Sequence, residues 1–353
     1  MSLITSTFQA LSMNRKERGN VKEDRVNASA HPTHHGPAPA LLLQLLEVRA
    51  IWEHYATLAM RLGWSMAAIG DGHPVLVLPG LCIGDAGTAL LRRFLISRGY
   101  AASGWGQGLN LGLTEGVLER AHDRLRQLYA EHGRTVSLIG WSLGGLYARE
   151  LAKHSPEMVR LCISLGSPFA GHPRETNVWR LYEFVSGHPV DWHDSHGPLR
   201  AAPPVPTTSI WSPTDGVVAW RSSVETRRIL SENVVIDSSH LGLCAHPAAL
   251  YAIADRLAQP EGQWEPFHRD GWRRLVYRDP KKLQTEREAA AHPGRRSTSG
   301  LVLLCHKLAL WQQGQRGSRR AMLRASLMRM VAIDVLMWRS ARIGGSAGSI
   351  TRG

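Results

Sequence analysis

One serine lies in a pattern suited to nucleophilic chemistry. Ser142 has a glycine two residues away on each side, in Gly140-Trp141-Ser142-Leu143-Gly144. An apolar run over residues 136–139 precedes it, and a helix-forming segment over residues 146–153 follows. A serine at the apex of a tight strand-to-helix turn has a strained backbone, and bulkier neighbours would collide there, which favours glycine. The turn would lift the hydroxyl out of a sheet and aim the Leu143 N–H at an oxyanion beside it.

A serine nucleophile needs a histidine as base and a carboxylate that orients the histidine. In parallel sheets, functional groups gather at the carboxyl ends of the strands. Asp215 follows closely after a predicted strand over residues 207–211, and His240 follows closely after another over residues 233–237. The chain order of serine, acid and histidine is also the order known for this chemistry on parallel sheets. We therefore predict Ser142 as nucleophile, Asp215 as orienting acid and His240 as base.

Each partner has an alternative in the sequence. Asp237 is a rival acid, but as the expected last residue of its strand it is close in sequence to His240 and should point elsewhere. His246 is a rival base, but it precedes Pro247 at a helix start, where a capping role is expected. Asp215 itself lies in an Asp-Gly turn, where an acidic residue can serve only to form the turn.

The oxyanion would need a second N–H donor from the loop after the first central strand. Pro79-Gly80-Leu81-Cys82 is that loop, and Gly80 permits a close backbone approach. We therefore predict the N–H groups of Leu81 and Leu143 as the oxyanion donors, with the Cys82 N–H as the alternative to Leu81. The Cys82 thiol is a weaker candidate nucleophile, because no histidine is fixed beside it in the sequence.

Strand and helix patterns alternate along the chain, which implies parallel strands with right-handed crossovers and helices on both faces of one sheet. Continuous apolarity in the first strand suits burial on both faces. The predicted strands are residues 74–79, 100–105, 134–140, 159–165, 207–211 and 233–237. The predicted helices are residues 41–62, 86–98, 114–132, 143–154 and 248–258.

The first predicted helix, residues 41–62, has a wide apolar face that we expect to pack across the sheet. Charged residues, among them Glu47 and Glu53, keep it from being a membrane span. The apolar face consists of Leu42, Leu45, Leu46, Val48, Ile51, Trp52, Tyr55 and Leu58.

Residues 170–206 interrupt the alternation and are too long for an ordinary connection, so we predict a lid with a helix near residues 177–185. Its aromatic side chains, Trp179, Tyr182 and Phe184, suggest an apolar acyl-binding site. The alternative is that these aromatic residues form only the small core of the lid itself.

These motifs resemble the α/β-hydrolase superfamily over about residues 73–257. More narrowly, the chain is similar to bacterial esterase- and lipase-like members, and the resemblance implies carboxylic-ester hydrolysis through an acyl-enzyme without a cofactor. Acyl transfer on the same fold, or a non-catalytic module that binds anionic lipid, are the alternatives. Pro79 stands where the family often has histidine, and the tail after about residue 266 matches nothing in the family. The motifs are Leu78-Pro79-Gly80-Leu81, Gly104-Trp105-Gly106, Gly140-Trp141-Ser142-Leu143-Gly144, Thr214-Asp215-Gly216 and Ser239-His240-Leu241-Gly242-Leu243.

Charge is distributed unevenly along the 353-residue chain. Residues 261–353 contain 18 Lys and Arg against 7 Asp and Glu, a net of +11 of the total +13. We therefore expect a basic extension of low order over residues 269–353. The motifs place an α/β-hydrolase domain over residues 41–268, with its lid at 170–206, and we expect residues 1–40 to be disordered. The extension suits weak contact with an anionic membrane surface, and it has no motif for nucleic acid.

The cysteines, Cys82, Cys162, Cys244 and Cys305, fit neither a disulfide framework nor a metal-binding spacing. A histidine-rich stretch over residues 31–35 could bind a metal only loosely, so we expect a solvated linker and no metal site. The N-terminus lacks a secretory signal pattern, and no run of about 18 uncharged apolar residues occurs. We expect a cytoplasmic protein, at most peripheral to a membrane, whose partner is a small acyl ester.

Overall fold

The computed structural model describes residues 38–59, 67–188, 199–226, 228–283 and 285. The predictions for residues 1–37, for Cys305 and for most of the basic extension lie outside the described residues.

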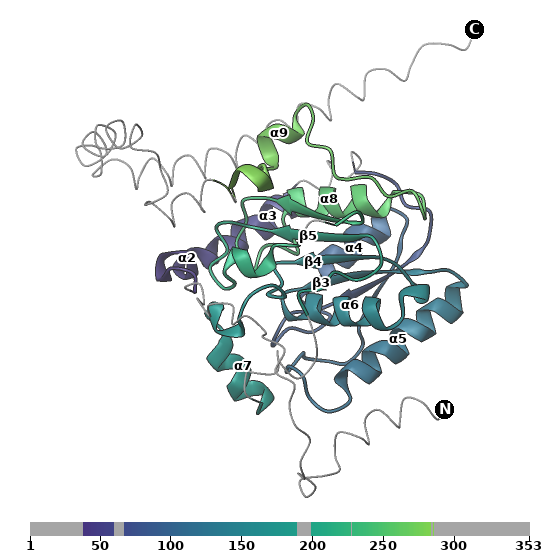
Figure 1. Cartoon of the computed structure of the whole chain (residues 1–353), viewed down its shortest axis with the longest axis horizontal. Coiled ribbons are helices and arrows are strands. Elements are labelled where there is room, and N and C mark those ends of the chain that lie inside the picture. Colours follow the sequence, from purple (N-terminus) through teal and green to yellow (C-terminus); the bar gives the residue numbers. More distant parts are fainter. Residues whose placement is uncertain (1–37, 60–66, 189–198, 227, 284, 286–353) are drawn as a thin grey trace, which may run out of the picture. The chain divides into compact units, whose positions relative to one another are not determined.

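A six-stranded sheet forms the centre of the described domain, with the strand order β2-β1-β3-β4-β5-β6 (Figure 1). Every neighbouring pair is parallel, as predicted. The two strands at the centre, β3 and β4, are buried along their whole length, because helices cover both faces. The strands are β1 (Pro74–Leu78), β2 (Ala101–Gly104), β3 (Val136–Trp141), β4 (Val159–Leu165), β5 (Thr207–Trp211) and β6 (Ser231–Val235).

Helices α5 and α6 share one apolar cluster with the sheet, and α4 and α8 share a second cluster on its other face (Figure 1). No helix in the described part of the chain has both the length and the apolarity to cross a membrane. The α-helices are α2 (Leu41–Leu45), α3 (Ala50–Ala59), α4 (Ala89–Ser97), α5 (Val117–His132), α6 (Leu143–His154), α7 (Trp179–Ser186), α8 (Pro247–Leu257) and α9 (Arg273–Val276). Short 3-10 helices are η1 (Leu46–Arg49), η3 (Pro156–Met158), η4 (Pro173–Glu175) and η6 (Trp220–Ser223).

The last strand begins and ends two residues earlier than predicted, because its first two residues are polar and hide the strand pattern. Glu232 is nonetheless buried: its carboxylate pairs with Arg256 at 3.1 Å and accepts a hydrogen bond from the Thr208 hydroxyl at 2.9 Å. Since β6 stops at Val235, Asp237 lies in the loop after the strand and is not its last residue.

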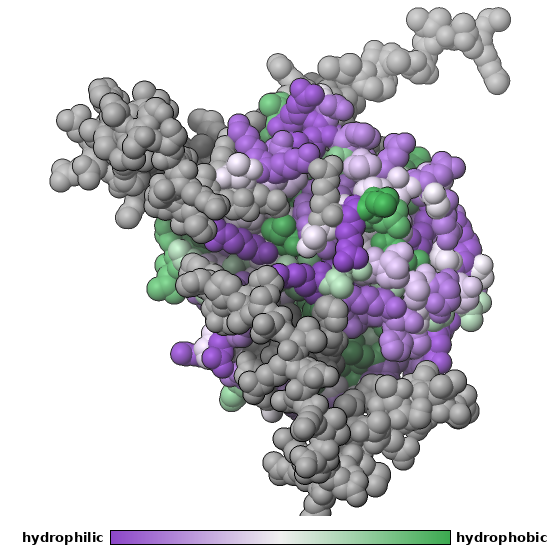
Figure 2. All heavy atoms as spheres, in the orientation of Figure 1, coloured by the Kyte–Doolittle hydropathy of each residue, from purple (hydrophilic) through white to green (hydrophobic). Residues whose placement is uncertain are grey.

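The prediction that the apolar face of residues 41–62 packs across the sheet is wrong. The segment is divided into α2, η1 and α3, and it turns its polar side toward the domain: Glu47, Glu53 and Thr57 are buried. Part of the outward apolar surface is visible in green at the left edge of Figure 2, where α2 lies in Figure 1. The predicted apolar face is exposed at Leu42, Leu45, Val48, Ile51, Trp52 and Tyr55.

The predicted domain boundary at residue 268 is too early. Tyr277 is only 1% exposed, and its hydroxyl donates a hydrogen bond to the Ala248 carbonyl oxygen at 2.9 Å. The Arg278 N–H donates to the Val235 carbonyl oxygen at 3.0 Å, so the chain adds an antiparallel bridge to the end of β6. Tyr277 therefore belongs to the core, although the surrounding sequence is charged and polar.

We expect Tyr277→Ala to lower the free energy of unfolding by about 3–5 kcal/mol, because it removes a buried aromatic ring and a buried hydrogen bond. Leu275→Ala is the matched control, since Leu275 is 65% exposed in the adjoining α9 and should change stability by about 0.5 kcal/mol or less. Urea unfolding of the full chain measures both. Equal effects of the two substitutions would show that residues after 268 are not part of the core.

Candidate active site

Ser142 occupies a sharp turn between β3 and α6. Its backbone has φ 54° and ψ −120°, in the left-handed half of conformational space that L-residues seldom occupy. The flanking glycines are required by close packing: a Cβ on Gly140 would collide with the backbone of Gly144, and one on Gly144 would collide with the Leu78 carbonyl oxygen. The glycine pattern thus permits α6 to approach β1 and β3 closely enough to hold the strained serine.

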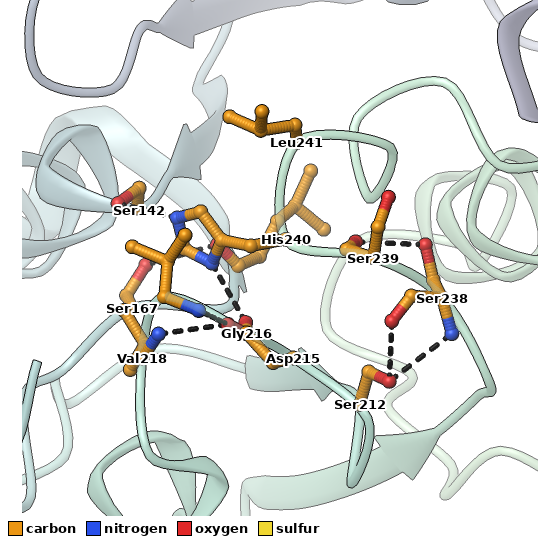
Figure 3. A network of polar contacts seen from close by, with 12 residues as sticks. Ser142, Ser167, Ser212, Asp215, Gly216, Val218, Ser238, Ser239, His240 and Leu241 are labelled. Carbon is orange, nitrogen blue, oxygen red and sulfur yellow. Dashed lines mark hydrogen bonds and ion pairs between the residues drawn. The ribbon is translucent and has the colours of Figure 1, made fainter. Parts of the chain in front are cut away.

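The structure brings the three predicted side chains together. The His240 Nε2 lies 2.9 Å from the Ser142 Oγ, and the His240 Nδ1 lies 2.7 Å from the Asp215 Oδ2. Figure 3 shows His240 between the other two residues. The second oxygen of Asp215 accepts the N–H groups of Val217 at 2.8 Å and Val218 at 2.7 Å, so the carboxylate is held on both sides. These contacts join the loops that follow β3, β5 and β6.

His240 is almost completely buried, with 3% of the residue exposed. Burial lowers the pKa of His240, but the charge and hydrogen bond of Asp215 and the charge of Glu47 raise it, with a net increase above the ordinary value. The neutral form, which can accept a proton from Ser142, is therefore lost as the pH falls through this raised pKa.

Both rival residues are engaged elsewhere. The Arg278 Nη2 donates to the Asp237 Oδ2 at 2.7 Å. The His246 Nδ1 accepts the Ala248 N–H at 3.2 Å, which makes His246 the N-cap of α8, as predicted.

The two predicted oxyanion donors lie at the ends of adjacent strands. Leu81 is in the loop after β1, and Leu143 is the first residue of α6. Within the described residues, neither N–H donates to a backbone acceptor. The Cys82 N–H, by contrast, donates to the Asn110 carbonyl oxygen at 2.7 Å. Cys82 is therefore disfavoured as an alternative to Leu81.

Asn110 is a fully buried residue that sequence reasoning missed. Its side-chain N–H donates to the Pro79 carbonyl oxygen at 2.8 Å, and its Oδ1 accepts the Tyr147 hydroxyl at 3.0 Å. The amide thus ties the loop after β1 to α6, the two segments that carry the N–H groups of Leu81 and Leu143. Its signal in the sequence is a single amide between two leucines in a glycine-rich loop, which is too common to stand out.

Ser212 and Glu47 also connect the loop that carries Asp215 with the loop that carries His240. No motif in the sequence marks either of these two residues. The Ser212 hydroxyl donates to the Ser238 carbonyl oxygen at 2.7 Å and accepts the Ser238 N–H at 3.0 Å (Figure 3). Glu47 accepts backbone N–H groups of both loops, including that of His240 at 2.9 Å. In the sequence, Glu47 is one charge on an amphipathic helix, where a solvated position is the normal expectation.

The aromatic residues of the predicted lid have different surroundings. Tyr182 is buried and Trp179 is half-buried, and both pack with the apolar cluster formed by α5 and α6. Phe184 is 86% exposed. Tyr182 and Trp179 thus have a packing role, close to the alternative given for them, and residues 189–198 of the lid lie outside the described residues.

A second serine–histidine–aspartate arrangement lies at the opposite end of the sheet. The His73 Nδ1 is 2.5 Å from the Asp71 Oδ1, and the His73 Nε2 is 2.8 Å from the Ser137 Oγ. Both His73 and Ser137 are fully buried at the beginning of β1 and β3, and burial lowers the pKa of His73. Because a substrate cannot reach Ser137, this arrangement stabilises the strand ends, and it provides an internal control for Ser142.

No protein-family model matches this sequence, and no curated protein matches it. Solved structures that resemble the chain include Aspergillus fumigatus lipase B, with 19% identity, 54% of this chain and 53% of that chain covered, and a TM-score of 0.44. Bacillus licheniformis lipase BlEst2 has 15% identity, 54% and 94% coverage and a TM-score of 0.41. Mouse alpha/beta hydrolase domain-containing protein 10 has 16% identity, 53% and 88% coverage and a TM-score of 0.39.

The match spans about half the length of both this chain and lipase B. With identities below 25% and TM-scores below 0.5, nothing about the activity of this chain follows from the likeness. The fold is evident from the chain itself, in the parallel strand order and in the sharp turn that carries Ser142 between β3 and α6. By this architecture the described domain has the α/β-hydrolase fold.

Proposed function

We propose that this chain is a serine hydrolase that cleaves carboxylic esters through an acyl-enzyme on Ser142. The observation that carries the proposal is the hydrogen-bonded line from Asp215 through His240 to Ser142. Ser142 is only half-buried, in contrast to Ser137, so a substrate can approach its hydroxyl. The strained backbone of Ser142 further supports a functional role, since strain of this kind needs close packing to persist.

In the proposed reaction, the Ser142 Oγ attacks the acyl carbon while the His240 Nε2 accepts its proton. Asp215 accepts the Nδ1–H of His240, which fixes the tautomer and stabilises the imidazolium. The N–H groups of Leu81 and Leu143 donate to the oxyanion of the tetrahedral intermediate. His240 then gives its proton to the leaving alcohol, and a water molecule, deprotonated by His240, hydrolyses the acyl-enzyme.

A panel of p-nitrophenyl esters of increasing acyl length tests this activity with a direct optical readout. An initial burst of p-nitrophenol, in proportion to the enzyme, would report the acyl-enzyme. Product analysis with and without an added alcohol distinguishes hydrolysis from acyl transfer, because both use the same intermediate.

Ser142→Ala should leave on the order of a thousandth of the ester turnover or less, because the nucleophile is gone. Ser137→Ala is the matched control: it also removes a hydroxyl bonded to histidine, but we expect it to cost about 1 kcal/mol of stability and leave the rate near that of the wild type. Steady-state assays of both folded variants make the comparison. Substantial turnover by Ser142→Ala would refute the assignment.

Asp215→Asn should lower kcat by on the order of 10³-fold or more, because asparagine cannot hold the same histidine tautomer. Asp237→Asn should stay close to the wild-type rate, since Asp237 bonds Arg278, whereas the Nδ1 of His240 bonds Asp215. Parallel kinetics of the two variants decide between the acids. A silent Asp215→Asn with an inactive Asp237→Asn would mean that the wrong carboxylate is assigned.

The pH profile of the wild-type enzyme should report the raised pKa of His240. Because the reaction needs neutral His240, kcat/KM should fall on the acid side with a midpoint above 6.5, the ordinary pKa of histidine. The measurement is kcat/KM for a soluble ester across the acid and neutral range. A midpoint below 6.5 would contradict the net effect of the surrounding carboxylates.

A further inference from the structure

Glu47 is a buried carboxylate that accepts hydrogen bonds both from the loop that carries Asp215 and from the loop that carries His240. Its Oε1 accepts the Gly216 N–H at 2.8 Å and the His240 N–H at 2.9 Å, and its Oε2 accepts the Leu241 N–H at 2.9 Å. Glu47 is buried, with only 7% of the residue exposed. Gly216 directly follows Asp215, so a single oxygen connects the backbones beside the proposed acid and base.

We propose that Glu47 is a positioning residue for the proposed ester hydrolysis: it fixes the His240 loop against the Asp215 loop and places a second negative charge near the imidazolium formed during the reaction. This inference rests on the proposed function, because it assigns Glu47 to the same histidine. Glu47 acts through the backbone and through its charge, and it is not placed in contact with the reacting atoms.

The contacts of Glu47 suit an ionised carboxylate whose charge is not neutralised by a neighbouring cation. All three of its partners are N–H donors, and an ionised carboxylate is a pure acceptor. Among the described residues, no basic side chain lies within 4.0 Å of it. The charge therefore remains available to stabilise a cation at His240.

Glu53, one helical segment further along, provides the contrast. It also bonds the histidine loop, through the Ser239 N–H at 2.9 Å and the Ser238 hydroxyl at 3.1 Å. Its Oε1, however, lies 3.6 Å from the Nε of Arg49, so its charge is largely balanced. Glu53 is thus a second buried carboxylate with similar hydrogen bonding but a compensated charge, which makes it a natural control.

The charged groups around His240 come from several elements. Asp215 contributes from the loop after β5, Glu47 from η1, Glu53 from α3, and Arg49, whose guanidinium donates to the Ser238 carbonyl oxygen at 2.6 Å, from the end of η1. The charges of Asp215 and Glu47 raise the pKa of His240. Removing the charge of Glu47 should therefore lower this pKa, so that neutral His240 persists to lower pH.

The test compares Glu47→Gln with Glu53→Gln in the full chain. The titration of His240 is followed by NMR with ¹³C-labelled histidine, its signal assigned by its loss in His240→Asn. We expect a lower titration midpoint in Glu47→Gln and an unchanged midpoint in Glu53→Gln. With p-nitrophenyl acetate, kcat of Glu47→Gln should fall by about 10- to 100-fold, the effect of one lost charge-assisted hydrogen bond, with little change in KM.

An unchanged midpoint in Glu47→Gln, or equal shifts in both variants, would overturn the proposal. Glu47→Asp keeps the charge on a shorter side chain, so it should retain the midpoint while kcat falls; this variant decides the matter if Glu47→Gln does not fold, and an unchanged kcat would then count against positioning. If the wild-type chain cleaves no ester while Glu47→Gln still lowers the midpoint, the proposed function fails and the coupling between Glu47 and His240 stands.

Discussion

The hydrogen bond between His240 and Asp215 is the contact on which the rest of the site depends. In the proposed reaction the buried imidazole becomes cationic, and it then needs negative charge beside it, because an unpaired buried charge costs several kcal/mol. Asp215 supplies this charge at 2.7 Å, and its second oxygen is held by two backbone N–H groups. The parallel sheet makes the contact feasible, since it places the ends of β5 and β6 side by side.

The same end of the sheet also carries a strained backbone at Ser142, and tight packing maintains it. Gly140 and Gly144 have no room for a side chain, so α6 rests directly against the ends of β1 and β3. Asn110 secures the neighbouring loop by donating to the Pro79 carbonyl oxygen. The histidine, the serine and the N–H groups around it are thus held by rigid elements and by buried polar contacts, a combination expected where geometry must be maintained.

The segment over α2, η1 and α3 shows how polar satisfaction can outweigh apolar burial. The loops after β5 and β6 contain several backbone N–H groups that no strand or helix accepts. Burying these groups without acceptors would be costly. Glu47 and Glu53 bond these groups, which forces Trp52 and Tyr55 to the surface. A periodic apolar face therefore did not predict which side of this segment faces the domain.

The sequence by itself determined the local events: the glycine-flanked serine, the strands with their approximate bounds, and the positions of Asp215 and His240 after two of these strands. These follow from backbone sterics and from the hydrophobic periodicity of short segments, which depend on neighbouring residues alone. Only the tertiary structure decided the inward direction of Glu47 and the inclusion of Tyr277 in the core, because both depend on partners far away in the chain. Buried polar groups are the hardest to foresee, since their burial is stabilised by atoms that the local sequence does not contain.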